Sequence, residues 1–497
     1  MKAERITISP FQFTRITECL IEKEVNSHGF AKVRGYIPPD MEQAYLTMAC
    51  SNMEVAISAV NEVGESNVIY CGILEDLQIT YKNSVCIMEI KIVPYTYLMD
   101  LTPTRRSFQI QEMPYQSVLD IVMAGYEGGA ALMNVGGDAA IGEPVVQYQE
   151  TDWEFVKRIS SYFNTVVTPS YTTSGAKLYV GLVEWPGASR MNPVCYQARK
   201  AVNEYLYKEQ NQVEGIVEDD SLWYVVEDQE LYEVGEMVTF QERVYYIARV
   251  ESRLDGHQLW NTYSLKTLAG FKVPKQYNDK IIGASLDGVI TAVSADVVRV
   301  QLNVDGAAGA GKWFPFSTVY SSPDGSGWYC MPEPGDEIRL YFPTEREKHG
   351  YVISSVHLPV TGTRAASSSG ASGSRAGSTS ANTTITSNNS TSPGASRSDP
   401  THKTIYTSSN KMVDLAETYI LLDTGTGMRI RLDDNEGITI ISSKGVKIKS
   451  DKSVDITSLG GKVEVAGMTS VDIKQNGSKM SLSAENVIIS GANAKVQ

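Results

Sequence analysis

The chain has 497 residues, of which 58 are Asp or Glu and 44 are Lys or Arg, giving a net charge of −14. At roughly 100 to 200 residues per domain, this length excludes a single domain and predicts two to four. The acidic balance argues against nucleic acid or an anionic lipid surface as a partner, while a hydrophobic content of 42% is sufficient for large cores.

The first 275 residues carry about −13 of the total charge and mix short strand patterns with helices. We expect one helix after Pro114, ending at Gly125 or Gly128, because glycine commonly ends helices. Two segments rich in β-branched and aromatic residues, 178–182 and 244–250, predict strands.

A second helix is predicted to begin at Thr151, in the sequence Thr-Asp-Trp-Glu. This is a capping box, in which the Thr151 hydroxyl accepts from the backbone N–H of Glu154 and the Glu154 carboxylate accepts from Thr151. Phe155 and Ile159 would then share one helical face.

Residues 281–360 contain short strand patterns only, at 288–293, 297–302, 336–342 and 351–356, separated by Gly, Pro and Asp turns. About 80 residues of this kind predict a small antiparallel barrel of OB type. The following segment, 361–401, is almost wholly Ser, Gly, Thr, Ala and Asn, and this composition is typical of a flexible linker.

The last block, 402–497, carries an apolar pair spaced i, i+2 that recurs about every eight residues with mostly polar residues between. The eight pairs predict the core of a shaft: Ile430 and Leu432, Ile438 and Ile440, Val446 and Ile448, Val454 and Ile456, Val463 and Val465, Val471 and Ile473, Met480 and Leu482, Val487 and Ile489.

Each pair is a short strand that lacks the apolar surface to form a core alone, so the stack of repeats must supply one. One strand and one corner per eight residues suits three chains wound round a common axis, and we therefore predict a homotrimer. An ordinary antiparallel meander with regular hairpins is the alternative, because it shows the same alternation.

The residues that carry chemistry elsewhere form no site in this sequence. The six cysteines lack C-x-x-C spacing, the five histidines do not cluster, and no protease, hydrolase or phosphate-loop motif is complete. The glycines at 306–311 precede Lys312 and Trp313 where a phosphate loop needs Ser or Thr, and residues 433–436 resemble a solvated turn more than a calcium site. We expect no catalytic, cofactor or metal site.

The N-terminus has no apolar segment typical of a signal peptide, and the sequence has no run of about 18 apolar residues. We therefore expect a protein that is made in the cytoplasm and stays soluble.

The order of the blocks resembles the VgrG-type central spike proteins of contractile injection systems and the phage baseplate hub and spike proteins, including late control protein D. The stretches that carry the resemblance are Tyr148–Ile159 in the first block, Gly327–Ile338 followed by Tyr351–Ile353 in the second, and the terminal repeat. It implies a mainly β protein with tail-hub β-barrels and a few helices, a small OB-type barrel, and a C-terminal intertwined trimeric β-helix.

The resemblance also implies a mechanical role. The hub would resemble tube-protein rings and adapt a sixfold tube to a threefold needle, and the needle would puncture a target envelope with transient membrane contact. The implied partners are the tail tube protein, baseplate proteins and two further copies of the chain, in a phage tail or a tail-like injection particle.

The sequence departs from some relatives in two ways. No lysozyme domain lies between the barrel and the repeat, and no histidine follows His402 to form the metal site found at some needle tips. A β-helix that ends without a cap exposes apolar edges, so we expect a separate PAAR-like tip protein at the C-terminal end.

Two other functions fit parts of the pattern. A tailspike-like β-helix can degrade polysaccharide with paired carboxylates or act as an adhesin, although short regular repeats leave no groove for a substrate. An OB barrel can bind nucleic acid, although this block has a net charge of about −4.

Overall fold

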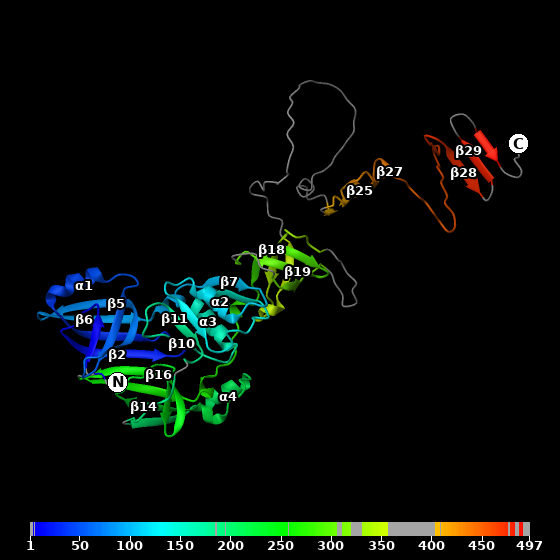
Figure 1. Cartoon of the computed structure of the whole chain (residues 1–497). Coiled ribbons are helices and arrows are strands. Elements are labelled where there is room, and N and C mark those ends of the chain that lie inside the picture. Colours follow the sequence, from blue (N-terminus) through cyan, green and yellow to red (C-terminus); the bar gives the residue numbers. More distant parts are fainter. Residues whose placement is uncertain are drawn as a thin grey trace. The chain divides into compact units, whose positions relative to one another are not determined.

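The computed structural model describes residues 3–490 except 4, 184–185, 194, 257, 306–310, 320–330, 356–402, 408, 476–477 and 483–486. The linker predicted at 361–401 and the stretch at 327–330 lie outside these residues. The protein is mainly β, and it divides into two compact units, residues 1–365 and 366–497, which we describe separately (Figure 1).

A twelve-stranded sheet dominates the first unit and consists of two modules of six strands. Module one contains β1 (Arg5–Ser9), β2 (Arg15–Glu24), β3 (Phe30–Ile37), β4 (Glu54–Val60), β5 (Ser66–Lys82) and β6 (Val85–Val93). Module two contains β12 (Ser189–Arg190), β13 (Cys195–Lys200), β14 (Leu222–Asp228), β15 (Met237–Phe240), β16 (Arg243–Asp255) and β17 (Gln258–Lys266). The segments predicted as strands at 178–182 and 244–250 are confirmed as β11 (Lys177–Val180) and part of β16.

The two modules have the same strand order. Module one runs β1-β4-β5-β6-β3-β2, and module two runs β12-β15-β16-β17-β14-β13. The long hairpins β5–β6 and β16–β17 each carry a bulge at the same distance from the turn, at Glu75 and at Ala248. The modules differ at one edge, where β1 is antiparallel to β4 but β12 is parallel to β15. The chain therefore contains a structural duplication.

The modules are joined through β2, which pairs antiparallel with β16 over Arg249–Arg253. Figure 1 shows the blue β2 beside the green β16. Each module also carries one short helix, α1 (Glu42–Met48) in the first and α4 (Val202–Gln210) in the second. Neither helix was predicted from the sequence.

A helical region is inserted between the modules. It contains β7 (Thr104–Phe108), α2 (Tyr115–Met123), β8 (Ala130–Met133), β9 (Val145–Glu150), α3 (Asp152–Ser161), β10 (Val167–Pro169) and β11. Both predicted helices are confirmed: α2 follows Pro114, and α3 begins at a complete capping box in which Thr151 and Glu154 exchange two hydrogen bonds of 3.1 Å.

The remaining strands of the first unit form a small barrel. They are β18 (Ser285–Ser294), β19 (Val297–Leu302), β20 (Trp313–Pro315), β21 (Glu337–Tyr341) and β22 (Tyr351–Ser355), in the order β20-β19-β18-β21-β22. A parallel bridge from Phe316, just after β20, to Val352 in β22 joins the two ends of this sheet. This closure, with a parallel contact between the third and fifth strands, is the OB arrangement predicted for this block.

The described residues of the first unit also form six short 3-10 helices: η1 (Pro39–Met41), η2 (Tyr95–Asp100), η3 (Glu218–Ser221), η4 (Ala269–Phe271), η5 (Asp279–Ile281) and η6 (Glu347–His349). Of these, η2 packs against α3, and η6 belongs to the barrel end of the unit.

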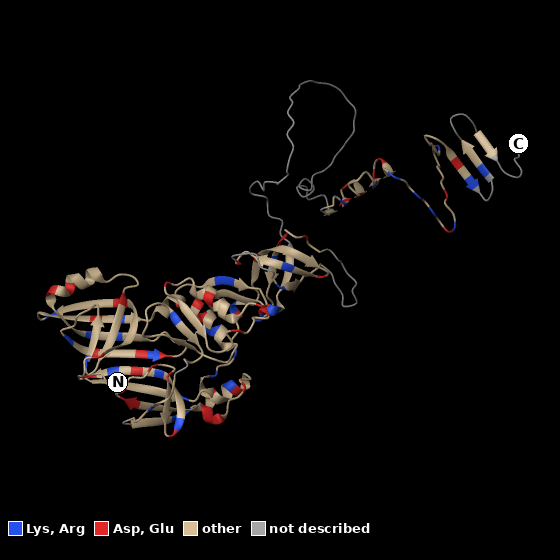
Figure 2. Ribbon diagram, in the orientation of Figure 1, with Lys and Arg blue, Asp and Glu red and all other residues tan. Residues whose placement is uncertain are grey.

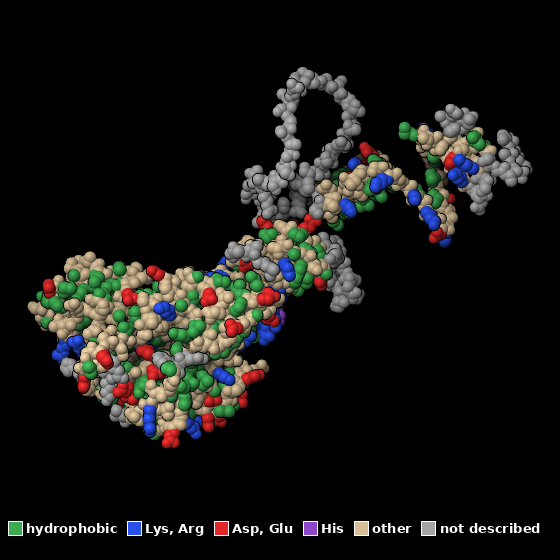
Figure 3. All heavy atoms as spheres, in the orientation of Figure 1, with side chains coloured by type: hydrophobic (Ala, Val, Ile, Leu, Met, Phe, Trp, Pro, Cys, Tyr) green, Lys and Arg blue, Asp and Glu red, His purple; other side chains and the backbone are tan. Residues whose placement is uncertain are grey.

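The second unit contains two antiparallel meanders. The first consists of β23 (Lys403–Tyr406), β24 (Met412–Leu415), β25 (Tyr419–Asp423), β26 (Arg429–Asp433) and β27 (Gly437–Ile441). The second consists of β28 (Val471–Gln475), β29 (Ser478–Leu482) and β30 (Val487–Ser490), and residues 442–470 contain no strand. Figure 2 shows Lys and Arg interspersed with Asp and Glu along this unit, and Figure 3 shows apolar side chains at its surface.

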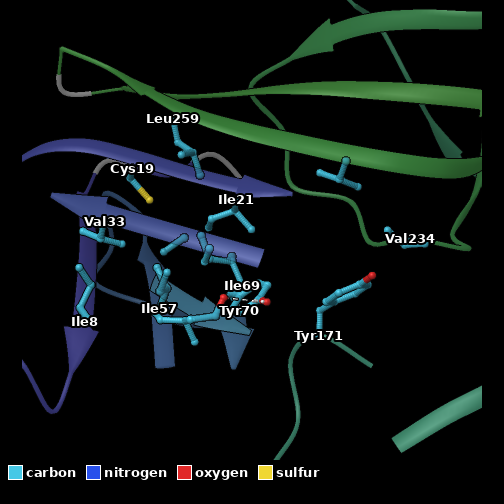
Figure 4. Close-up of a cluster of buried hydrophobic side chains, with 14 of the residues drawn as sticks. Ile8, Cys19, Ile21, Val33, Ile57, Ile69, Tyr70, Tyr171, Val234 and Leu259 are labelled. Carbon is cyan, nitrogen blue, oxygen red and sulfur yellow. Dashed lines mark hydrogen bonds between the residues drawn. The ribbon is translucent and has the colours of Figure 1, made fainter. Parts of the chain in front are cut away.

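The first unit has separate apolar cores for the sheet, the inserted region and the barrel. The sheet core is shared by both modules, since Ile21, Val33 and Ile57 of module one lie in one cluster with Val234 and Leu259 of module two (Figure 4). Burial of this kind stabilises a fold by about 1.5 to 3 kcal/mol per large aliphatic side chain. The pairing of β2 with β16 is therefore supported by a common core.

Candidate functional site: the shaft face and the hub–barrel junction

The predicted shaft residues in the first meander lie on a single face of its sheet. Ile430 pairs with Ile440 and Leu432 with Ile438 across β26 and β27, and residues paired directly across strands project to the same side. The face continues through the other strands, where Ile420 pairs with Leu432. Nine apolar residues share it: Ile405, Val413, Leu415, Ile420, Leu422, Ile430, Leu432, Ile438 and Ile440.

This face is exposed in the single chain. Ile438 is 73% exposed and Ile440 54%, and side chains of the face line a hollow of about 390 Å³. Soluble monomers rarely expose large continuous apolar patches.

The second meander repeats the arrangement. Val471 pairs with Leu482, Ile473 with Met480, and Met480 in turn with Ile489, so the six predicted residues in these strands also share one face. The remaining member, Val487, pairs with Leu482.

Six predicted shaft residues lie in the segment without strands, 442–470, and are exposed: Val446, Ile448, Val454, Ile456, Val463 and Val465. The strands on either side of this segment form antiparallel hairpins. This is the meander that the sequence analysis gave as the alternative to a trimeric β-helix. In the single chain the repeats therefore do not form one continuous series of strands, and the intertwined β-helix stays a prediction.

The structure adds five residues to the apolar face that the repeat pattern missed: Ile405, Val413, Leu415, Ile420 and Leu422. Two of the missed pairs, Val413 with Leu415 and Ile420 with Leu422, have the same i, i+2 spacing as the repeat. They were missed because the turn at 424–428 lengthens the spacing between β25 and β26 and interrupts the eight-residue period.

The junction between the inserted region and the barrel is built on Arg158 of α3. Its guanidinium donates from Nε to Glu150 at 2.8 Å and from Nη1 to Glu347 of η6 at 2.9 Å. It also donates from Nη2 to the carbonyl oxygen of Val146 at 2.9 Å. Because Glu150 belongs to β9 and Glu347 to the barrel, one side chain joins three elements.

This junction is buried. Arg158 is 2% exposed, and the Glu150 and Glu347 side chains are 8% exposed. Burial raises the pKa of Glu150, and the neighbouring Arg158 opposes that rise. Val146 packs within the barrel core itself, so apolar contact accompanies the ion pairs. The first unit thus connects its inserted region to its barrel through a buried contact in which one guanidinium pairs with two carboxylates.

The other residues considered for chemistry have structural roles. The carboxylate of Asp433 accepts from the backbone N–H groups of Asn435 and Glu436, and these bonds, together with Arg431, lower its pKa. It therefore shapes a turn. The glycine-rich segment 306–310 lies outside the described residues.

Among the described residues, no group of three or more His, Cys, Asp and Glu side chains is placed to hold a metal ion, and no helix is long and apolar enough to cross a membrane.

The fold of this chain resembles that of solved structures of a type VI secretion system component and of a VgrG complex. No protein-family model and no curated protein sequence matches the chain. Its fold is recognised from its similarity to solved structures.

The E. coli c3393 protein, described as a component of the type VI secretion system with structural similarity to the T4 bacteriophage tail proteins gp27 and gp5, is one of them. It matches 70% of this chain and 99% of its own at a TM-score of 0.51 and 10% identity. The structure of the Francisella PdpA-VgrG complex in its half-lidded form matches 88% of each chain at a TM-score of 0.50 and 8% identity. The resemblance noted from the sequence is thus confirmed at the level of the fold.

Proposed function

We propose that this chain is the hub and central spike of a contractile injection system and that it works as a homotrimer. The observation that carries the proposal is the duplication of the six-stranded module. Three chains contribute six modules of like strand order but only three shafts. This combination suits an adapter between a sixfold tube and a threefold needle.

The apolar faces of the second unit support the same assembly. Three copies around one axis would turn these faces toward one another and remove them from water, at about 25 cal/mol for each Å² of apolar surface buried. In this arrangement Val446, Ile448, Val454, Ile456, Val463 and Val465 belong to the shaft core, where strands of the other two copies supply their neighbours.

The proposed role is mechanical and uses no catalytic step. The tail tube protein binds the hub side, baseplate proteins surround it, and a PAAR-like protein covers the needle tip. The assembled phage tail or tail-like particle drives the needle through a target envelope.

Mass measurement by light scattering tests the trimer. At micromolar concentration we expect three times the chain mass of 54.5 kDa, and a monomer would contradict the proposal. Ile440→Asp should abolish or weaken the trimer, because it introduces three buried carboxylates. Thr439→Asp is the matched control, since Thr439 lies beside Ile440 on the opposite face of β27.

A further inference from the structure

Among the described residues, the twelve-stranded sheet has several open edges, and two of them are long edges that the duplication relates to each other. β4 covers β5 only from Ser66 to Ile73, so one edge of residues 75–82 is open while β6 pairs with the other. β13 pairs with β14 on one side, and all six of its residues are exposed. Open edges of this length invite pairing with another chain.

The duplication indicates what fits the open half of β5. Its counterpart in module two is β16, and there the same half of the strand pairs with β2. The counterpart of β2 is β13, since each comes last in the strand order of its module. The sheet thus contains one complete junction, β2 on β16, and the two separate halves of a second.

We propose that β13 of one copy pairs antiparallel with residues 76–80 of β5 in the next copy, so that three copies close a ring of six modules. This inference rests on the proposed trimer and specifies its hub interface. The alignment of the two hairpins by their turns and bulges transfers the register of the complete junction. The expected pairs are Leu77 with Lys200, Gln78 with Arg199, Ile79 with Ala198, and Thr80 with Gln197.

The charges at the two junctions are complementary with their signs exchanged. In the complete junction, Arg249 of β16 donates from Nη2 to Glu22 of β2 at 2.9 Å. The counterpart of Arg249 is Asp76, and the counterpart of Glu22 is Arg199. The proposed junction therefore places an acidic residue on the long strand and a basic residue on the edge strand.

The exchange also opposes one wrong pairing. β2 on β5 would place Glu22 beside Asp76. β13 on β16 would place Arg199 beside Arg249 but directly opposite Glu251, so charge does not oppose that pairing. Like charges across strands are destabilising, whereas opposite charges stabilise. Charge therefore disfavours a ring in which module one pairs with module one.

The proposed junction would also cover apolar surface. Leu77 and Ile79 are half-buried and already pack against the sheet core. Tyr196 of β13 is 55% exposed and lies on the same face of its strand as Ala198.

Disulfide cross-linking of the full chain tests the register. Ile79→Cys with Ala198→Cys should give covalent trimers on a non-reducing gel. The background is Cys50→Ser, Cys195→Ser and Cys330→Ser, which removes the two thiols exposed among the described residues and the one at position 330. Residues directly opposite across strands have Cβ atoms about 4.5 to 5.5 Å apart, close enough to bridge with small adjustment. Thr80→Cys with Ala198→Cys is the off-register control, because these side chains project to opposite faces.

Charge reversal tests the pairing rule. In the cross-linking background, Arg199→Glu alone or Asp76→Arg alone should lower the yield of covalent trimer about threefold, and the double reversal should restore it. A trimeric mass without the Ile79–Ala198 cross-link would overturn this junction and leave the proposed function standing. Equal yield from the off-register control would overturn the register, and a monomeric mass would overturn the proposed function itself.

Discussion

Replacing Arg158 with leucine tests whether the buried junction fixes the barrel to the inserted region. The change removes the hydrogen bonds to Glu150, Glu347 and the Val146 carbonyl and leaves two carboxylates, each 8% exposed, without their counter-charge. Loss of one partner from a buried ion pair costs about 3 to 5 kcal/mol. For a unit of this size, we expect Tm to fall by roughly 5 to 10 °C.

The assay is thermal unfolding of the full chain, followed by circular dichroism and calorimetry, with Arg339→Ala as the matched control. Arg339 also forms an ion pair in the barrel, with Asp287, but both side chains are more than half exposed. Such a pair contributes about 0 to 1 kcal/mol. Equal small shifts for the two variants would refute the reasoning.

The pH dependence of the Arg158→Leu variant gives an independent check. Burial raises the pKa of Glu150, so this group favours the folded state at low pH and loses that contribution as the pH rises through its folded pKa. Without Arg158 the pKa rises further. The variant should therefore be only slightly less stable than the wild type near pH 4, and the difference in their free energies of unfolding should grow towards pH 8. A difference that does not depend on pH would contradict this role of Glu150.

Three further outcomes are expected. Ile448→Asp should abolish the trimer measured by light scattering, because the predicted shaft core would contain three unpaired carboxylates at a cost of several kcal/mol; a stable trimer would show that this register is wrong. Thr151→Ala removes the capping box of α3 and should lower the free energy of unfolding by about 1 kcal/mol in denaturant titration, whereas Thr47→Ala, on the exposed face of α1, should change it less. Burial lowers the pKa of His28 to about 4, so the wild type should lose stability as the pH falls from about 6.5 towards 4; an NMR titration of His28 with an ordinary pKa would contradict this.

Local signals in the sequence predicted local structure well. The capping box at Thr151, the helix after Pro114 and the strands of the OB barrel depend on residues close together in the chain, and each lies where the pattern placed it. The i, i+2 pairs likewise predicted which side chains share a face in both meanders.

The duplication could not be predicted in this way. When residues 66–93 are aligned with 239–266 by their bulges and turns, no position carries the same amino acid in both. A sheet module requires alternating apolar residues and a suitable turn, and many sequences meet that requirement.

The buried junction was missed for a related reason. Arg158 lies within a stretch that carried the family resemblance, but its partner Glu347 is 189 residues further along the chain. Nothing in the spacing of charged residues indicates a contact over that separation. Only the fold shows that two acidic side chains converge on one guanidinium.

The duplication has a consequence for symmetry. In a ring made of six identical single-module chains, every module would carry the same insertion and the same edge charges. Fusion of two modules in one chain lets them diverge: the helical insertion occurs once per pair, and the charges of Glu22 and Arg199 differ in sign. In the proposed trimer, such a chain would present sixfold repetition on its sheet and threefold repetition elsewhere, and the mismatch between the two symmetries would be resolved within the covalent structure of each protomer.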